Sequence, residues 1–147
     1  MKEIHTEIEI ESSAEHVWQL LTDFPSFPQW NPSIRRASGE IKVGERLEVE
    51  SGFSGAKGRI LRLRVLKAEP DRELRWLGHL WIPGLFDGEH LFIIEPLGPS
   101  RVRFIQLKIF IGLLISLFAR RLDTDVPRGF KEMNHALKKW PKPLGCG

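Results

Sequence analysis

The sequence predicts an α+β domain, in which helices cover one side of an antiparallel sheet. Three observations lead to this prediction. The chain begins with a segment whose apolar residues alternate with polar ones, and residues 33–109 contain further segments of this kind, separated by turn residues. The last part of the chain instead repeats its apolar residues at steps of three or four. We therefore expect about seven strands, two short helices after the first strand, and a long C-terminal helix.

The length of 147 residues indicates a single domain. We assign residues 1–141 to this domain and expect residues 142–147 to form a flexible tail. Cys146 is the only cysteine, so the chain cannot form an internal disulfide. The N-terminal sequence MKEIHTEIEIES lacks the apolar core of a secretory signal peptide, and we expect a cytoplasmic protein.

The first strand and the first helix follow from local patterns. Residues 3–11 place their isoleucines at period two, which predicts a strand. Ser12 and Glu15 have the spacing of a capping box, so we expect a helix to begin near Ser13. This helix must end before Pro25, because proline does not fit a helix interior.

The stretch FPSFPQWNPSI, residues 24–34, combines aromatic side chains with prolines. We predict a short helix or turn over residues 24–29, and expect Phe27 and Trp30 to cover apolar groups rather than face water. The sequence leaves two interpretations open. Trp30 either fills the core beside the short helix or forms part of the wall of a ligand pocket.

The middle of the chain is predicted to be an antiparallel meander, because short alternating segments recur there between turn residues. The strands are expected at residues 33–38, 45–51, 59–68, 73–81, 89–95 and 101–109. Residues 83–88 (PGLFDG) are interpreted as a loop.

The C-terminal part is predicted to be a long amphipathic helix with a kink or restart at residues 123–127, because Pro127 interrupts the pattern. The apolar run at residues 109–119 is too short to span a membrane, which requires about 20 residues. We interpret this run as the buried start of the helix, so we expect no stable membrane insertion.

Four segments, VWQLLTDFPSFPQWNP, GEHLFIIEP, IFIGLL and RGFKEMNHALK, occur in an order that resembles the START/Bet v 1-like (SRPBCC) superfamily. Within it, the chain is similar to the polyketide cyclase/dehydrase and lipid-transport group of bacterial proteins, over residues 3–139. The resemblance implies a helix-grip fold, in which a curved sheet wraps around the C-terminal helix and encloses an apolar pocket. Members of this superfamily include carriers, receptors and cyclases, so the resemblance alone does not decide the function.

Given such a pocket, we expect its walls to be formed by aromatic residues together with a few polar ones. The predicted ligand-binding residues are Phe27, Trp30, Trp76, His90, Phe92, Phe104, Gln106, Phe130, Met133 and Asn134.

His90 is the principal polar candidate, because a strand would place it on the same face as Phe92 and Ile94. It could bind a ligand carbonyl or act as an acid or base near neutral pH. The alternative is a buried histidine that hydrogen-bonds a neighbour. For Asn134, the alternative to a pocket position is an exposed amide on the helix surface.

Lys108 shares a predicted strand face with Gln106. Relatives often carry an acidic residue near this position, so the lysine places any acid–base function borrowed from them in doubt. Its ammonium group could pair with a ligand carboxylate or phosphate. The alternative is that the stem packs and the ammonium extends to solvent.

Other classes of function find no support in the sequence. The five histidines lack the spacing of a zinc site, and no phosphate loop, dinucleotide motif or nucleophile motif is present. We therefore predict no metal and no cofactor. Lysine and arginine are spread along the chain, which argues against nucleic-acid binding.

The predicted function is the binding of an apolar or amphipathic small molecule, such as a lipid, fatty acid or polyketide, in an interior pocket. The first alternative is a cyclase or aromatase that uses His90 as acid or base. The second is a module whose apolar segment 109–119 binds a protein or a membrane surface. The oligomeric state is open.

Overall fold

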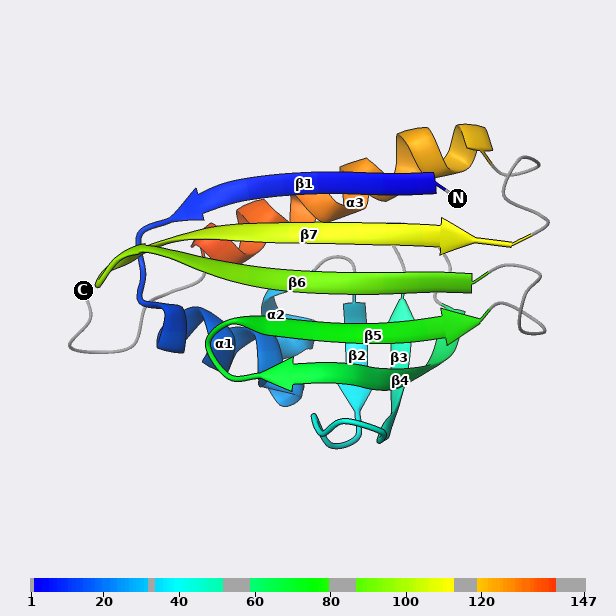
Figure 1. The fold of residues 1–147 in the computed structure, drawn as a ribbon, viewed down its shortest axis with the longest axis horizontal. Helices are drawn as coiled ribbons and strands as arrows, with labels where there is room; N and C mark the ends of the chain where they lie inside the picture. The colour runs from blue at the N-terminus through cyan, green and yellow to red at the C-terminus, as the bar shows by residue number, and fades with distance from the viewer. Residues whose placement is uncertain (1, 32–33, 52–58, 80–86, 113–118, 140–147) are drawn as a thin grey trace.

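The computed structural model of the chain describes residues 2–31, 34–51, 59–79, 87–112 and 119–139. They form a seven-stranded antiparallel sheet in the order β1-β7-β6-β5-β4-β3-β2, with helices on one side (Figure 1). The strands are β1 (Lys2–Ile10), β2 (Ile34–Ser38), β3 (Arg46–Ser51), β4 (Arg59–Glu69), β5 (Glu73–His79), β6 (Asp87–Gly98) and β7 (Arg101–Ile111). The helices are α1 (Ala14–Thr22), the single-turn η1 (Phe24–Ser26), α2 (Phe27–Trp30) and α3 (Ala119–Lys139). The predicted α+β class is confirmed.

The sheet is strongly curved. Strands β2 and β3 run across the direction of β5, β6 and β7 (Figure 1). The sheet therefore bends strongly between these two groups of strands. The pairing of β4 with β5 shifts register between Val65 and Lys67, and such a bulge increases the local twist of a strand. Helix α3 lies behind β1 and β7, on the same side of the sheet as α1 and α2 (Figure 1). This arrangement fits the helix-grip fold.

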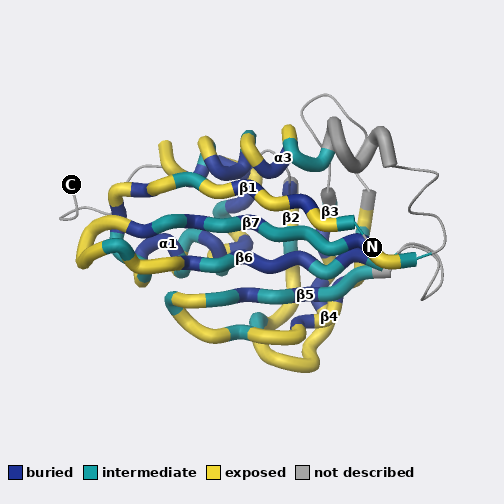
Figure 2. Tube along the Cα trace, turned by 45° about the horizontal axis from the view of Figure 1, so that its top comes forward, coloured by how far each residue is buried: buried dark blue, intermediate teal, exposed yellow. Residues whose placement is uncertain are grey.

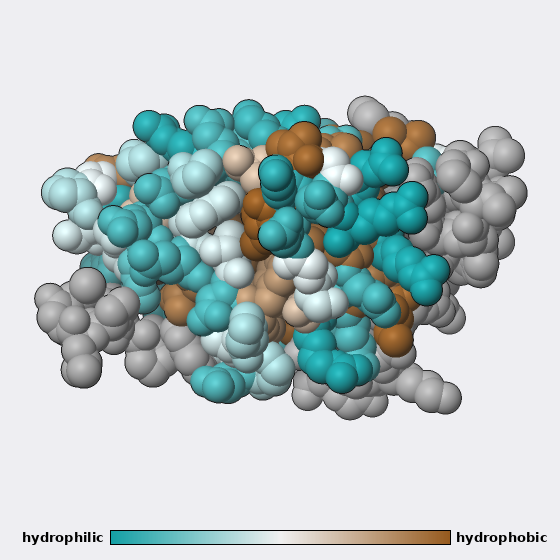
Figure 3. Space-filling view, turned by 90° about the horizontal axis from the view of Figure 1, so that it is seen from below, coloured by the Kyte–Doolittle hydropathy of each residue, from teal (hydrophilic) through white to brown (hydrophobic). Residues whose placement is uncertain are grey.

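The two faces of the sheet differ in chemistry. Side chains on the concave face are largely buried and apolar, as the alternation of buried and exposed positions along β6 and β7 shows (Figure 2). On the convex face Arg75 forms ion pairs with Glu73 at 2.9 Å and with Glu89 at 3.4 Å. Figure 3, which shows the molecule from below, presents a mainly hydrophilic surface with apolar side chains between the polar ones.

The aromatic stretch after α1 is part of the core. Phe27 is fully buried, and its ring meets those of Phe24 and Trp30 edge to face, each at 5.3 Å between centroids. The indole N–H of Trp30 donates to Ser26 Oγ at 3.2 Å. These residues belong to the main core cluster, which also contains Val65, Phe92 and Met133 among others. Whether a ligand contacts Trp30 stays a prediction.

The structure corrects the predicted start of the first helix. Ser13, rather than Ser12, is the capping residue, and its Oγ accepts a hydrogen bond from the backbone N–H of His16 at 3.1 Å. Ser13 has the extended backbone that a capping residue needs, whereas the N–H of Ser12 donates to the carbonyl of Ile10. The Ser12–Glu15 spacing was therefore a misleading signal.

Two further predictions about the C-terminal half were wrong. Residues 109–111 are not the start of a helix but the end of β7, where Phe110 pairs with Lys2 of β1 and Gly88 of β6. A short apolar run fits a buried strand as well as a helix, so its pattern could not decide. Residues 113–118 lie outside the described residues. Strand β6 begins at Asp87, inside the segment that was predicted to be a loop.

Helix α3 passes through Pro127 without a restart, contrary to one of the two predicted outcomes. Proline removes one backbone hydrogen bond, but the buried side of α3 continues on both sides of it, from Val126 to Leu137. Packing against the sheet thus holds the helix together across this position.

We predict that Ser13→Ala destabilises the protein by about 1 kcal/mol, because it leaves an N–H of the first turn without its acceptor. Ser12→Ala is the matched control and should change stability by no more than about 0.5 kcal/mol. Urea unfolding followed by circular dichroism measures both values. The opposite ranking of the two variants would show that Ser12 is the cap after all.

Candidate functional site

A chain of buried polar side chains crosses the interior between the sheet and α3. His90 Nε2 lies 3.0 Å from Gln106 Oε1, and Gln106 Nε2 donates to Asn134 Oδ1 at 2.7 Å. Asn134 Nδ2 in turn donates to Thr6 Oγ1 at 3.1 Å. The four residues come from β6, β7, α3 and β1, and all are buried. Buried polar groups are tolerated when they are hydrogen-bonded in this way.

A backbone carbonyl determines which group donates and which accepts in each hydrogen bond between Gln106 and its neighbours. Gln106 Nε2 also contacts the carbonyl oxygen of Phe130 at 3.3 Å, and a carbonyl can only accept a hydrogen bond. The amide nitrogen of Gln106 must therefore face α3, and its oxygen faces His90. His90 then has to donate from Nε2, so the neutral ring carries its lone pair on Nδ1.

Aromatic rings surround His90. Its ring stacks on Phe92 at 4.1 Å and lies 4.8 Å from the ring of Phe130, while Trp76 meets it edge to face at 5.9 Å. Burial lowers the pKa of His90 well below its ordinary value of 6.5, and the charge of Lys108 lowers it further. The hydrogen bond with Gln106 opposes these effects only in part. His90 is therefore neutral at pH 7.

Lys108 is the cross-strand partner of His90, so both side chains lie on the concave face. Its stem occupies the space above Gly88, where a Cβ atom would come within 2.9 Å of Lys108 Cε and 3.2 Å of Nζ. The Nζ atom lies 5.7 Å from the centre of the Phe110 ring. Burial lowers the pKa of Lys108 to about 8. The stem thus packs on the inner face, while the residue as a whole is half-buried. Whether the ammonium group binds a ligand or extends to solvent stays a prediction.

The polar chain divides the interior into two apolar parts. The main cluster lies on one side and includes Phe92, Phe104 and Met133. Ile4, Phe110 and Phe130 form a separate cluster, with Val126 packed against it. Lys108 lies next to this second cluster, because Ile4 is its partner on β1.

All ten residues predicted to bind a ligand are buried. Ring contacts and hydrogen bonds join seven of them into one group, which consists of Trp76, His90, Phe92, Phe104, Gln106, Phe130 and Asn134. Phe27, Trp30 and Met133 belong to the main core cluster, which they share with Trp76, Phe92 and Phe104.

Sequence reasoning weighed a surface position for Asn134, which is 2% exposed. It missed Thr6, although the alternation that places Ile4 and Ile8 inward also places Thr6 inward. A threonine on the otherwise apolar inward face of this strand was the available signal for a polar partner on the facing helix.

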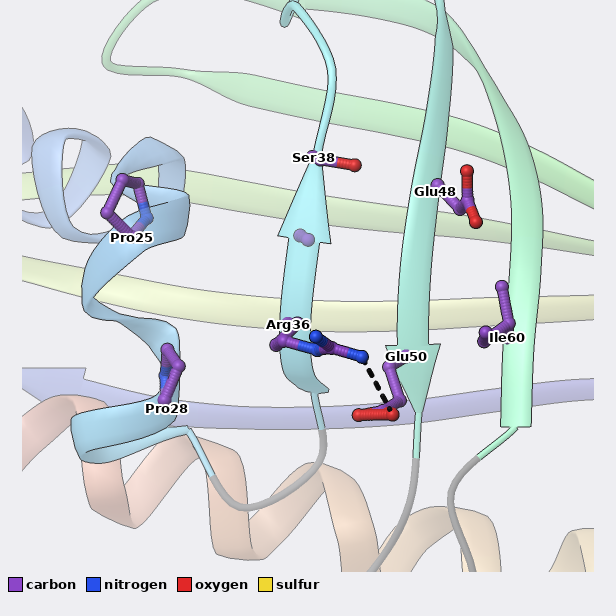
Figure 4. A pocket seen from close by; sticks show the side chains of 8 residues that line it. Pro25, Pro28, Arg36, Ser38, Glu48, Glu50 and Ile60 are labelled. Atoms are coloured by element: carbon purple, nitrogen blue, oxygen red, sulfur yellow. Dashed lines mark hydrogen bonds and ion pairs between the residues drawn. The ribbon is translucent and has the colours of Figure 1, made fainter.

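One hollow that described residues outline lies away from this polar chain. It measures about 480 Å³ on the convex side of β2, β3 and β4, and Pro25 and Pro28 form its other wall (Figure 4). Arg36 bridges part of it through an ion pair with Glu50 at 3.4 Å. Its mixed charged and apolar lining contains none of the predicted site residues.

Within the part of the chain that the structure describes, no group of three or more His, Cys, Asp or Glu side chains could hold a metal ion. Among the same residues, no helix is long and apolar enough to span a membrane.

Comparison with known proteins shows the family to which the chain belongs. The model of the family described as "Polyketide cyclase / dehydrase and lipid transport" matches residues 1–139. The chain belongs to this family. The search of curated protein sequences finds no match.

Several solved structures share the fold of this family member. The Zhui aromatase/cyclase from Streptomyces sp. R1128 has a TM-score of 0.75 at 14% identity, over 92% of this chain and 90% of its own. A START superfamily protein from Mycobacterium smegmatis has a TM-score of 0.70 at 18% identity, over 95% and 99%. The di-domain ARO/CYC BexL of the BE-7585A biosynthetic pathway has a TM-score of 0.74 at 15% identity. The match covers 93% of this chain but 46% of BexL.

Gln106→Met should destabilise the protein by roughly 3 kcal/mol or more, because it leaves Asn134 Oδ1, the Phe130 carbonyl and His90 Nε2 without their partner. Gln19→Met provides a matched control, since Gln19 is exposed on α1. Chemical unfolding of both variants tests the prediction. Equal stabilities would mean that the buried polar chain contributes little.

Lys108→Met should stabilise the protein at pH 7 by on the order of 2 kcal/mol, because it removes a half-buried charge whose pKa is lowered from 10.5 to about 8. Between pH 8 and 10.5 the unfolded state holds more protons on this residue than the folded state. Wild-type stability therefore rises across this window, and the advantage of Lys108→Met should shrink.

Thermal or urea unfolding at several pH values from 7 to 10.5 measures this difference. Lys131→Met, at an exposed position of α3, controls for the loss of a charge in general. A difference between wild type and Lys108→Met that stays constant with pH would contradict the assigned burial of the ammonium group.

Proposed function

We propose that this protein binds an apolar or amphipathic small molecule between the concave face of the sheet and α3, with His90 orienting the polar end of the ligand. The observation that carries the proposal is the one-way hydrogen-bond chain, which leaves the lone pair of His90 Nδ1 directed away from Gln106. Nδ1 makes no hydrogen bond with any described residue, and 7% of His90 stays accessible. A ligand hydroxyl could donate to it.

The surroundings of His90 suit an apolar ligand body. Trp76, Phe92 and Phe130 supply aromatic surface around the imidazole. Burial of apolar ligand surface contributes about 25 cal/mol per Å², whereas a few polar groups fix the orientation of the ligand. The sequence predicts ligand contacts for Gln106 and Asn134. We propose instead that these two residues hold His90 in place.

The family supports this proposal in a general way, because its description combines lipid transport with cyclase and dehydrase chemistry. The similarity to the Zhui aromatase/cyclase and to the START superfamily protein supports the shared fold. The present chain has a neutral histidine and a lysine at the centre of its concave face, and these two residues give it its own polar chemistry.

We expect protein purified under gentle conditions to carry an apolar molecule with an O–H donor, at one molecule per chain. Native mass spectrometry followed by solvent extraction identifies it. As a control, protein stripped of bound molecules by unfolding and refolding should bind 1-dodecanol, detected by a change in tryptophan fluorescence. The proposal fails if the purified protein is empty and the stripped protein does not bind 1-dodecanol.

One observation favours a second candidate function, a cyclase-type enzyme. His90 is neutral at pH 7 and has a free lone pair, so it could accept a proton from a carbon between two carbonyls, while Lys108 stabilises the resulting enolate oxygen. Formation of an aromatic product from a short poly-β-keto thioester, followed by absorbance, tests this role. The enzyme should lose about 100-fold or more of its rate in His90→Gln. A wild-type rate equal to that of buffer would eliminate this candidate.

A further inference from the structure

We propose that the ligand is a hydroxy acid, whose carboxylate binds the ammonium group of Lys108 while its hydroxyl donates to Nδ1 of His90. The inference rests on the proposed function and specifies the chemical class of the ligand. Lys108 would recognise the negative charge of the ligand, and His90 would recognise its neutral hydroxyl group.

Lys108 is held on the inner face by its neighbours. It alternates with Gln106 and Phe110 along β7, and both of these side chains are buried. Across the sheet it pairs with His90 on β6 and with Ile4 on β1. The absence of a side chain at Gly88 leaves the space that the lysine stem occupies. The ammonium group therefore approaches the inner face rather than the convex surface.

This cation has no carboxylate partner among the residues whose side chains the structure describes, which on α3 are residues 126–139. The carboxylates of β6 nearest to it, Asp87 and Glu89, occupy positions that alternate with Gly88 and His90 and so face the other way, where Glu89 pairs with Arg75 at 3.4 Å. The inward positions next to Lys108 on β6 are Gly88 and His90. Phe110 supplies a ring 5.7 Å away, which compensates a buried charge only weakly.

A half-buried cation without a counterion destabilises the folded protein. A pocket that contains such a cation should therefore bind an anionic ligand more tightly than a neutral one. The carboxylate is the anion that matches a single ammonium group in charge. At pH 7 most Lys108 side chains are protonated, because the pKa is about 8. The ligand carboxylate would supply the ion-pair partner of Lys108 that the described side chains do not supply.

His90 adds the second part of the recognition pattern. As direct cross-strand partners, Lys108 and His90 have their Cβ atoms about 5 Å apart. The lone pair of Nδ1 repels a carboxylate oxygen but accepts a hydroxyl proton. A molecule with a hydroxyl close to its carboxylate, as in a 3-hydroxy acid, fits both groups at once. The remainder of such a ligand would lie along Phe92 and the apolar residues beyond it.

Four probes test the two contacts separately: dodecanoic acid, 3-hydroxydodecanoic acid, and the methyl ester of each. Dissociation constants are measured at pH 7 by tryptophan fluorescence for the wild type, Lys108→Met, His90→Phe and Lys131→Met. We expect the wild type to bind each acid at least about tenfold more tightly than its ester. We also expect the hydroxyl to improve binding about fivefold.

Lys108→Met should remove the preference for acid over ester and keep the gain from the hydroxyl. His90→Phe should do the reverse, and Lys131→Met, at an exposed position, should keep both. Equal binding of acid and ester by the wild type would overturn the inference but leave the proposed function intact. A preference for acids that survives in Lys108→Met would also overturn it. Failure of all four probes to bind the wild type would overturn the inference. It would refute the proposed function as well if the purified protein is empty and 1-dodecanol does not bind.

Discussion

The interior depends most on the hydrogen bonds that the side-chain amide of Gln106 makes. This amide is fully buried, and it joins β7 to α3 through Asn134 and the Phe130 carbonyl while it orients His90 on β6. A buried amide that loses its partners costs more than a hydrogen bond contributes, so each partner constrains the others. The position of α3 on the sheet, the tautomer of His90 and the separation of two apolar clusters all follow from this one group.

The polar chain also explains why the interior is chemically asymmetric. On one side lies an extended aromatic and aliphatic cluster, and on the other a small cluster accompanies Lys108. A lysine in such a place lowers the stability of the folded protein, because burial disfavours its charged form. A protein selected only for stability would replace it with an apolar residue of similar size. Its presence is therefore easier to explain by recognition than by folding.

Much of the fold could be predicted from the sequence, because alternation and turn residues define the strands. The pattern of Ile4, Ile8 and Ile10 specifies β1, and the face that His90 shares with Phe92 was correct. The start of α1 was misplaced by one residue, since Ser12 and Ser13 are both good capping residues and only the backbone decides. The apolar residues 109–111 were misassigned, because their partners on β1 and β6 are distant in sequence. For the same reason Thr6 escaped notice.

The hydrogen bond between Thr6 and Asn134 joins two residues separated by 128 positions in the chain. The meander from β2 to β7 pairs neighbouring segments, so it can form from local contacts, whereas this bond needs the first strand and the last helix together. During synthesis the N-terminal strand leaves the ribosome long before α3 does. The interior of the nascent chain thus stays open to solvent until α3 has been synthesised. The interior therefore closes only once the segment that forms α3 can pack against β1.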